Sequence, residues 1–277
     1  MAVVVSKLGG EAGFVGCVGN DLYGRLLRDT LVRNGVSADG LQETDKANTT
    51  LAIVMVDPDG ERNFSFYRKP GADTLIDPDR AVQDTAGTGI LHFGSVSLTD
   101  PLCRNAVITT VQEAKKAGAL ISYDPNYRAS LWENEDTAIQ QMRAVLPLCD
   151  IVKISDEETV LLCGVQDPEA ALKKLTDMGI RLAIVTLGAR GAMWRYGNLQ
   201  DLVPGFSVKV ADTNGAGDTF FGVFLSRIAA RGGLDQLTED EINSYVRFAN
   251  KAASITASRP GAIPAMPTLK EVQEDET

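Results

Sequence analysis

The amino-acid sequence predicts an α/β fold built on a doubly wound, mostly parallel β-sheet with helices on both faces. Short apolar runs alternate with helix-length segments along most of the chain, which is typical of parallel strands joined by helical crossovers. The 277 residues, 44% hydrophobic and 23% charged, suffice for one large globular domain or two small ones. Because no repeat, low-complexity tract or linker interrupts the chain, we expect a single domain over residues 1–277.

Seven runs are expected to form strands because each is short, apolar and bounded by turn-forming residues. They are residues 13–18, 51–56, 63–67, 90–96, 120–123, 151–154 and 182–187.

The segment 49–68 departs from the strand–helix alternation. Two β runs are joined here by residues 57–60, Asp-Pro-Asp-Gly, which is the signature of a type I turn. No helix separates the runs, so we expect an antiparallel hairpin. Such a ribbon in a parallel fold is either an edge extension of the sheet or a lid over a site.

Two helices carry clear end signals. Asp100 is a candidate N-cap followed by Pro101 at the first helical position, and Gly118 ends the apolar periodicity. Thr238 and Glu241 have the spacing of a capping box ahead of a second helix.

The charge balance excludes whole classes of partner. Lys and Arg number 27 against 37 Asp and Glu, giving a net charge of −10 and a pI near 4.7. Sequence-independent nucleic-acid binding is driven by cationic contacts to phosphate, so no nucleic-acid partner is expected. No apolar run reaches the length of a membrane span, and residues 1–5 do not form a signal peptide.

The cysteines and the single histidine also limit the chemistry. Four cysteines are far apart, form no CxxC pair and lie among apolar residues, so buried reduced thiols and a cytoplasmic location are expected. One histidine excludes a multi-histidine metal site. His92 lies in a strand-like run and is expected to be a sheet residue, not a catalyst.

The most informative segment is residues 210–222, with the sequence VADTNGAGDTFFG. It follows a strand-like run at 206–210 and leads into a helix that we expect to be amphipathic. Glycines at a helix start leave backbone N–H groups uncovered, and the helix dipole favours an anion there. A carboxylate beside such a phosphate site, Asp218, would repel the ligand unless it accepts a proton from a hydroxyl attacking the phosphate.

The run Asp-Thr-Asn-Gly-Ala-Gly-Asp at 212–218 resembles the C-terminal signature of the PfkB, ribokinase-like carbohydrate kinases. Other segments are similar to the family in the expected order, and the hairpin and later segments resemble fructokinases in particular. The segment similar to the N-terminal signature of the family is 8–24. The segments that resemble fructokinases are 60–73, 92–95, 122–128 and 153–158. The resemblance implies a ribokinase-like fold, a sugar and ATP as substrates, and Mg²⁺.

Carried over to this chain, the resemblance assigns the chemistry to the glycine-rich segment. Asp218 is implied to be the base that deprotonates the primary hydroxyl of the sugar. The backbone of Gly215, Ala216 and Gly217 is implied to form the anion hole for the transferring phosphoryl group.

The resemblance also implies ATP contacts. The turn at 186–191 is similar to the ATP-contacting turn of the family, with Thr186 and Gly188 near the phosphates and Gly191 closing it. A plain hairpin turn is the alternative for this segment. Asn250 matches a position near adenine, and an exposed helical asparagine is the alternative there.

The remaining implied positions concern the sugar and the ions. Asn126 and Arg128 are implied to face the sugar or the phosphates, although without the family Arg128 reads equally as a surface charge. Glu158 matches an acidic residue that acts through Mg²⁺ and its water shell, with Ser155 where the family has asparagine. Asp212 matches a position near a monovalent-cation site, which would take K⁺.

The resemblance places residues 1–8 inside a helix, whereas local propensity alone makes Val3 to Val5 a strand. Relatives have a first core strand, a sugar-binding aspartate and part of the lid before this point. We therefore expect a chain shortened at its N-terminus, by truncation or by a misassigned start codon, with a neighbouring strand left unpaired.

The leading hypothesis is an ATP- and Mg²⁺-dependent fructokinase that makes fructose 6-phosphate. A kinase of another sugar, or of a 2-keto-3-deoxygluconate-type acid, is an alternative because Arg62, Arg68 and Lys69 supply cations near the hairpin. The third reading is an inactive nucleotide- or sugar-binding remnant. A homodimer through the lid is the expected oligomer.

Overall fold

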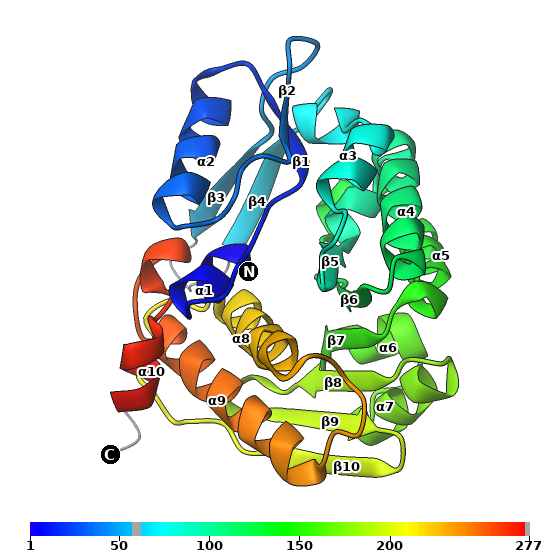
Figure 1. Cartoon of the computed structure of the whole chain (residues 1–277), viewed down its shortest axis with the longest axis vertical. Helices are drawn as coiled ribbons and strands as arrows, with labels where there is room; N and C mark the ends of the chain where they lie inside the picture. The colour runs from blue at the N-terminus through cyan, green and yellow to red at the C-terminus, as the bar shows by residue number, and fades with distance from the viewer. Residues whose placement is uncertain (57–61, 275–277) are drawn as a thin grey trace.

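The computed structural model describes residues 1–56 and 62–274 and centres on a six-stranded sheet of order β10-β9-β8-β7-β6-β5 (Figure 1). Strands β5 to β8 are parallel, and β9 and β10 add an antiparallel edge. The strands are β5 (Ile90–Gly94), β6 (Leu120–Asp124), β7 (Ile151–Ser155), β8 (Leu182–Thr186), β9 (Ala192–Tyr196) and β10 (Leu199–Val203). The predicted mostly parallel sheet is confirmed.

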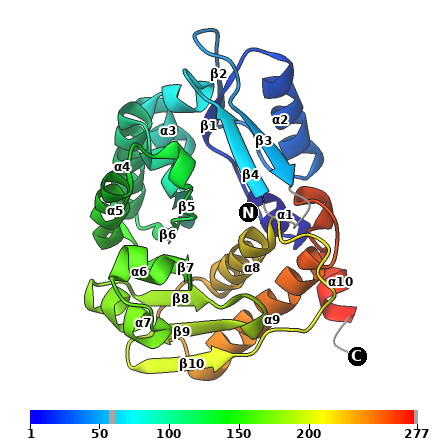
Figure 2. The ribbon, with the colours of Figure 1, turned by 180° about the vertical axis from the view of Figure 1, so that it is seen from behind.

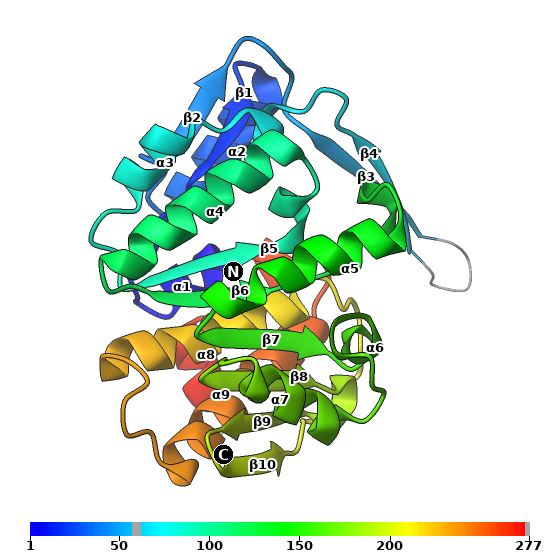
Figure 3. The same ribbon diagram turned by 90° about the vertical axis from the view of Figure 1, so that its right-hand side faces the viewer.

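Helices cover both faces of this sheet (Figures 1 and 3). One face packs against α8 (Ala216–Arg231) and α9 (Glu239–Ala257), where Ile151, Ile184 and Trp194 lie in one buried cluster. A second cluster, which includes Val152 and Ile154, lies on the other face. The helices on that side are α4 (Pro101–Lys116), α5 (Glu135–Ala144), α6 (Glu158–Cys163) and α7 (Pro168–Asp177). Two cores on opposite faces are what a doubly wound fold requires.

The remaining elements are short or peripheral. The helices are α1 (Ala2–Lys7), α2 (Leu22–Arg33), α3 (Pro78–Asp84) and α10 (Leu269–Glu274). Single 3₁₀ turns lie at 72–75, 95–98, 129–131, 146–148, 188–190 and 263–265.

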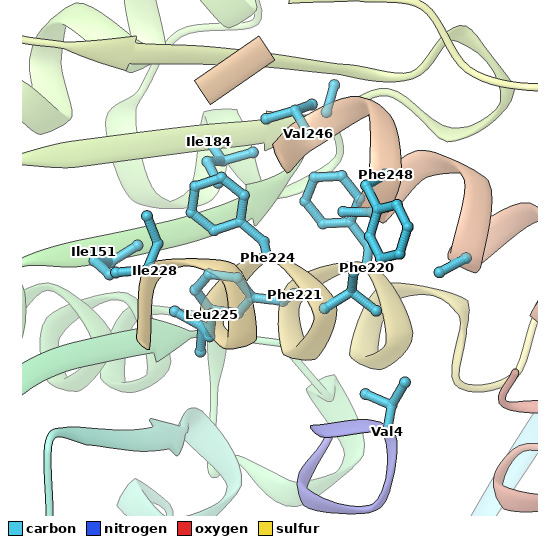
Figure 4. Packing of buried hydrophobic residues seen from close by; sticks show 14 of the residues in the cluster. Val4, Ile151, Ile184, Phe220, Phe221, Phe224, Leu225, Ile228, Val246 and Phe248 are labelled. Atoms are coloured by element: carbon cyan, nitrogen blue, oxygen red, sulfur yellow. The ribbon is translucent and has the colours of Figure 1, made fainter. Parts of the chain in front are cut away.

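Helix α8 is the centre of the larger core (Figure 4). In that view Ile184 and Val246 lie on one side of α8 and Val4 of α1 lies on the other. A Cβ atom built on Gly222 would lie 2.5 Å from Val4 Cγ1, so α1 and α8 touch closely at this glycine. The expectation of an amphipathic helix was wrong, because α8 is buried on several sides. The same packing explains why residues 2–7 are helical despite three consecutive valines.

Both predicted capping signals are confirmed. The Asp100 carboxylate accepts hydrogen bonds from the backbone N–H groups of Leu102 and Cys103 at the start of α4. Thr238 and Glu241 form the reciprocal capping box at the start of α9. These local contacts satisfy backbone donors that have no partner inside the helix.

Two small sheets lie apart from the six-stranded sheet. Strands β1 (Gly16–Gly19) and β2 (Leu41–Thr44) pair in parallel, and β3 (Leu51–Val56) and β4 (Arg62–Tyr67) form the predicted antiparallel hairpin. In Figure 3 the hairpin lies on the side of the molecule to which the carboxyl end of β7 points, and Figure 2 shows it beside α2. The predicted turn at 57–60 lies outside the described residues.

Some strand predictions were wrong or absent. Residues 206–210 are not a strand: they run unpaired, with Val208 and Val210 exposed. Strands β2, β9 and β10 were not predicted, because they are short and mix polar with apolar residues. Strand β5 has β6 as its one strand partner within the described residues.

The four cysteines are buried and free, as predicted. Among the described residues, none of the helices combines the length and the apolar composition that a membrane span requires.

Candidate active site

A cavity of about 360 Å³ opens where the carboxyl ends of β6 and β7 meet the N-terminus of α8. In open parallel sheets, ligands bind at this edge. The lining residues are Asp124, Asn126, Arg128, Lys153, Thr213, Asn214, Gly215, Gly217 and Asp218. A second cavity of about 400 Å³ adjoins it through Asn126, Arg128 and Lys153 and includes Glu158. The structure therefore brings Asn126, Arg128, Glu158 and Asp218 together, as expected.

The first turn of α8 presents both an anion site and a carboxylate. Gly215 is the N-cap, with φ +78°, and a Cβ there would lie 3.2 Å from Ala262 Cβ, so this position requires glycine. Outside its own helical turn, the nearest described atom to a Cβ on Gly217 is Lys153 Nζ, at 3.6 Å, and Gly217 lines the cavity. No side chain caps this helix end among the described residues, and the positive end of its dipole faces the cavity.

Asp218 follows directly in the first turn of α8, and its side chain is 47% exposed. The Met1 amino group lies 3.8 Å from its Oδ1. A carboxylate so placed can accept a proton from a hydroxyl bound beside the anion site. The Ala216 N–H, in contrast, closes the turn on the Thr213 carbonyl at 3.3 Å.

Asp212 holds the glycine-rich loop in shape. Its Oδ1 accepts from the Asn214 N–H at 2.8 Å, and its Oδ2 accepts from the Gly261 N–H at 3.0 Å. The carboxylate thus ties the approach to α8 to the segment after α9.

Glu158 links the loops that follow β6 and β7. Its Oε1 accepts from the Tyr127 N–H at 2.8 Å, and its Oε2 accepts from the N–H and hydroxyl of Ser155 at 2.9 and 3.2 Å. Ser155, where the family has asparagine, therefore contacts Glu158 directly. These bonds fix the loop that carries Asn126 and Arg128.

That loop has an unusual backbone. Asn126 adopts φ +47°, which is uncommon for a residue other than glycine and is typical of functional sites. The Arg128 Nη1 donates to the Tyr127 carbonyl at 3.0 Å, and the side chain borders both cavities. Arg128 is therefore a half-buried cation at the edge of both cavities.

Sequence reasoning missed an ion pair in the cavity wall. Lys153 Nζ lies 2.8 Å from Asp124 Oδ2, and the two side chains are only 8% and 7% exposed. Burial opposes the charge on Lys153, but Asp124, with Glu158 and Asp218 nearby, raises the pKa of Lys153 overall. Burial raises the pKa of Asp124 to about 6, against the lowering effect of Lys153. The available signal was a lysine inside the apolar strand 151–154, beside an aspartate that ends the neighbouring strand.

The predicted ATP-contacting turn lies near the cavities but does not line them. Residues 187–191 connect antiparallel strands β8 and β9, so the segment is a hairpin turn in structure. Gly191 has φ +102°, and a Cβ there would lie 2.1 Å from the Val203 carbonyl oxygen. Gly188 has φ +58°, and Thr186 pairs with Ser155 of β7.

Asn250 is buried in α9, so the exposed alternative is wrong. Its Nδ2 donates to the carbonyls of Val203 and Pro204, both at 3.1 Å. The side chain holds the segment that follows β10.

His92 behaves as the predicted sheet residue. Its Nδ1 lies 3.0 Å from Ser122 Oγ, and its ring stands edge-on to Phe221. Burial lowers the pKa of His92 to about 3, so the ring is neutral at physiological pH.

Comparison with known proteins agrees with this geometry. A model of the pfkB family carbohydrate kinases matches residues 1–269. A probable fructokinase-4 of Arabidopsis thaliana is 41% identical over 278 residues, which cover 99% of this chain and 84% of that protein. The fructokinase-2 of Solanum lycopersicum is 40% identical over 277 residues, covering 98% of this chain and 83% of that protein.

Solved structures give the same answer for the fold. A fructokinase from Xylella fastidiosa with bound ATP is 35% identical, with a TM-score of 0.89 over 100% of this chain and 89% of that one. A fructokinase from Vibrio cholerae O395, with fructose, ADP and calcium bound, is 32% identical, with a TM-score of 0.89 over 99% of this chain and 88% of that one. The fold is ribokinase-like, and the chain belongs to the pfkB family of carbohydrate kinases.

Proposed function

We propose that this chain transfers the γ-phosphoryl group of ATP to the 6-hydroxyl of fructose. The observation that carries the proposal is the first turn of α8. There Asp218 lies next to Gly217, at a helix N-terminus that no described side chain caps and that can bind an anion. The relatives at about 40% identity that carry the name fructokinase support fructose as the acceptor.

The proposed reaction is a direct displacement at phosphorus. The fructose 6-hydroxyl oxygen attacks the γ-phosphorus, and the bond to the β,γ-bridging oxygen breaks with its electron pair remaining on ADP. Asp218 accepts the hydroxyl proton and later releases it to water. The backbone N–H groups around Gly215 and Gly217 stabilise the charge on the transferring group. Asn126 and Arg128 line the same cavity and would hold the substrates there.

The residues at the site fit a Mg²⁺ ion that is held mainly by water and substrate phosphates, not by a full set of protein ligands. Among the described residues, no three His, Cys, Asp or Glu side chains gather as a metal site. Mg²⁺ commonly keeps several waters and is held through substrate phosphates. Glu158 lines the second cavity, and within the described residues its Oε1 accepts one hydrogen bond, so it can accept another from metal-bound water. The ion would neutralise phosphate charge.

The contacts of Arg68 disfavour a keto-sugar acid as substrate. Its guanidinium donates to the Asp73 carboxylate at 2.7 Å and to the Thr99 hydroxyl at 2.5 Å. A cation already neutralised by a carboxylate offers little to an acidic substrate. Fructose, which carries no charge, is the better match.

A coupled assay of ADP release across a sugar panel tests the proposal. We expect turnover with fructose, a product that serves phosphoglucose isomerase as fructose 6-phosphate, and at least tenfold lower kcat/KM for 2-keto-3-deoxygluconate. A chain stabilised by ATP analogues in thermal unfolding that turns over no sugar would instead be a binding remnant.

Three further features belong to the proposal. A homodimer through the hairpin is supported by Ile53, Val54 and Met55, which are exposed on β3. Light scattering should give twice the monomer mass.

A cytoplasmic location is supported by the four free, buried cysteines. K⁺ near Asp212 should raise kcat when it replaces Na⁺ in the assay.

A further inference from the structure

The Lys153–Asp124 pair is not explained by stability. Lys153 pairs across the strands with Ile184, and Ile151 and Ile184 belong to the apolar cluster against α8. Replacing a buried ion pair with apolar residues is commonly neutral or stabilising, because both charges lose their hydration. The fold could therefore accept an apolar residue at position 153.

The ammonium group of Lys153 is directed at the anion site. It borders both cavities, and the nearest atom to a Cβ built on Gly217 is Lys153 Nζ, at 3.6 Å. A lysine ammonium has three N–H donors. Within the described residues, Lys153 uses one of them, in its hydrogen bond to Asp124. Its other N–H bonds and the first turn of α8 thus bound the same space from two sides.

The surrounding charges show why a cation is needed there. Asp124 and Asp218 line the first cavity, Glu135, Glu157 and Glu158 line the second, and Arg128 is the other cation among the lining residues. Carboxylates repel a phosphoryl group, whereas a fixed ammonium attracts it. Asp124 keeps that ammonium charged and in place despite its burial.

We propose that Lys153 is a catalytic residue that binds the transferring phosphoryl group opposite Gly217, and that Asp124 is the residue that positions it. The inference rests on the proposed function. Lys153 keeps its proton throughout: the P–O bond to ADP breaks and the bond to the sugar oxygen forms while the ammonium neutralises charge on the non-bridging oxygens.

Steady-state kinetics of Lys153→Met provide the first test. We expect kcat to fall about 100- to 1,000-fold, with the KM for fructose changed less than threefold, and Lys153→Arg to recover part of the loss. The matched control is Lys115→Met, since Lys115 Nζ lies 3.3 Å from Asp150 Oδ1 in a pair outside both cavities. The control should keep kcat within twofold.

The double variant Lys153→Met/Asp124→Leu separates chemistry from folding, because it leaves no buried charge unpaired. We expect it to restore the Tm lost in Lys153→Met but not kcat. Recovery of kcat in the double variant, or a Lys153→Met kcat within threefold of the unaltered chain, would overturn the inference.

A binding measurement keeps the test independent of the sugar. Aluminium fluoride with ADP and Mg²⁺ mimics the transferring phosphoryl group. We expect aluminium fluoride to lower the Kd for ADP of the unaltered chain. In Lys153→Met and Asp124→Asn this lowering should be at least tenfold smaller, while the Kd for ADP alone stays within threefold of that of the unaltered chain. An unchanged lowering of the Kd would contradict the role of Lys153. Absence of sugar turnover by the unaltered chain would contradict the proposed function only.

Discussion

Gly217 and Lys153 face each other across the cavity: a Cβ on Gly217 would lie 3.6 Å from Lys153 Nζ, the nearest described atom outside its own helical turn. The gap between the glycine backbone and the ammonium is where the proposed reaction places the phosphoryl group. Because a single methyl group can be added there without a clash, the gap can be tested without disturbing the fold.

Gly217→Ala should separate activity from stability. Alanine is the better helix former, so the free energy of unfolding should stay level or rise by about 0.5–1 kcal/mol. The added methyl group occupies the anion site, so kcat should fall about 100-fold. Denaturant unfolding and ADP release on the same sample measure both. Full activity in Gly217→Ala would show that the phosphoryl group binds elsewhere.

Glu158→Gln should weaken both stability and catalysis. Glu158 is buried and accepts three hydrogen bonds, one at Oε1 and two at Oε2. Glutamine replaces one of these oxygens with an NH₂ group, which cannot accept the hydrogen bonds made there. We expect a loss of about 1–3 kcal/mol and a kcat about tenfold lower, since the Asn126–Arg128 loop loses its anchor. Glu169→Gln, an exposed first-turn residue of α7, is the control and should change neither.

Asn250→Leu should raise the KM for ATP and leave that for fructose unchanged. The substitution removes the donor to the Val203 and Pro204 carbonyls, which costs about 1–3 kcal/mol of stability. Asn243→Leu is the matched control on α9, because Asn243 bonds to Asp201 and Trp194 away from the site. If both variants change the KM for ATP equally, Asn250 has no particular role in nucleotide binding.

The single histidine gives a pH prediction. The pKa of His92 is lowered from 6.5 to about 3 by burial, so below pH 6.5 the unfolded chain takes up a proton that the folded chain excludes. Stability therefore falls as pH falls, by about 1–2 kcal/mol between pH 7 and 5 from this residue. His92→Asn should remove that contribution when unfolding is compared across pH. An identical pH dependence in the variant would mean that His92 protonates in the folded state.

The sequence predicted the elements whose signals are local. Asp100 and Thr238 cap their helices as expected, and β3 matches its predicted bounds. Strands β9 and β10 were not predicted, because β9 pairs with β8 and β10 pairs with β9, and neither carries an apolar run of its own.

The site divides in the same way. The glycine-rich run drew attention to Gly215, Gly217 and Asp218, which line the first cavity and are close together in the sequence. Asp124 and Lys153 were missed because they are 29 residues apart and become neighbours only when β6 pairs with β7. Asn250 was expected near adenine, but its hydrogen bonds to carbonyls at 203 and 204 could not be read from its own helix.

The most direct test of the account is the kinetics of Asp218→Asn, with Asp177→Asn on the surface as control. We predict that kcat for fructose falls at least 1,000-fold, that the Kd for ATP measured by calorimetry changes less than threefold, and that the control matches the unaltered chain. A kcat within tenfold of the unaltered chain, or an equal loss of ATP binding, would contradict the assignment of Asp218 as the base.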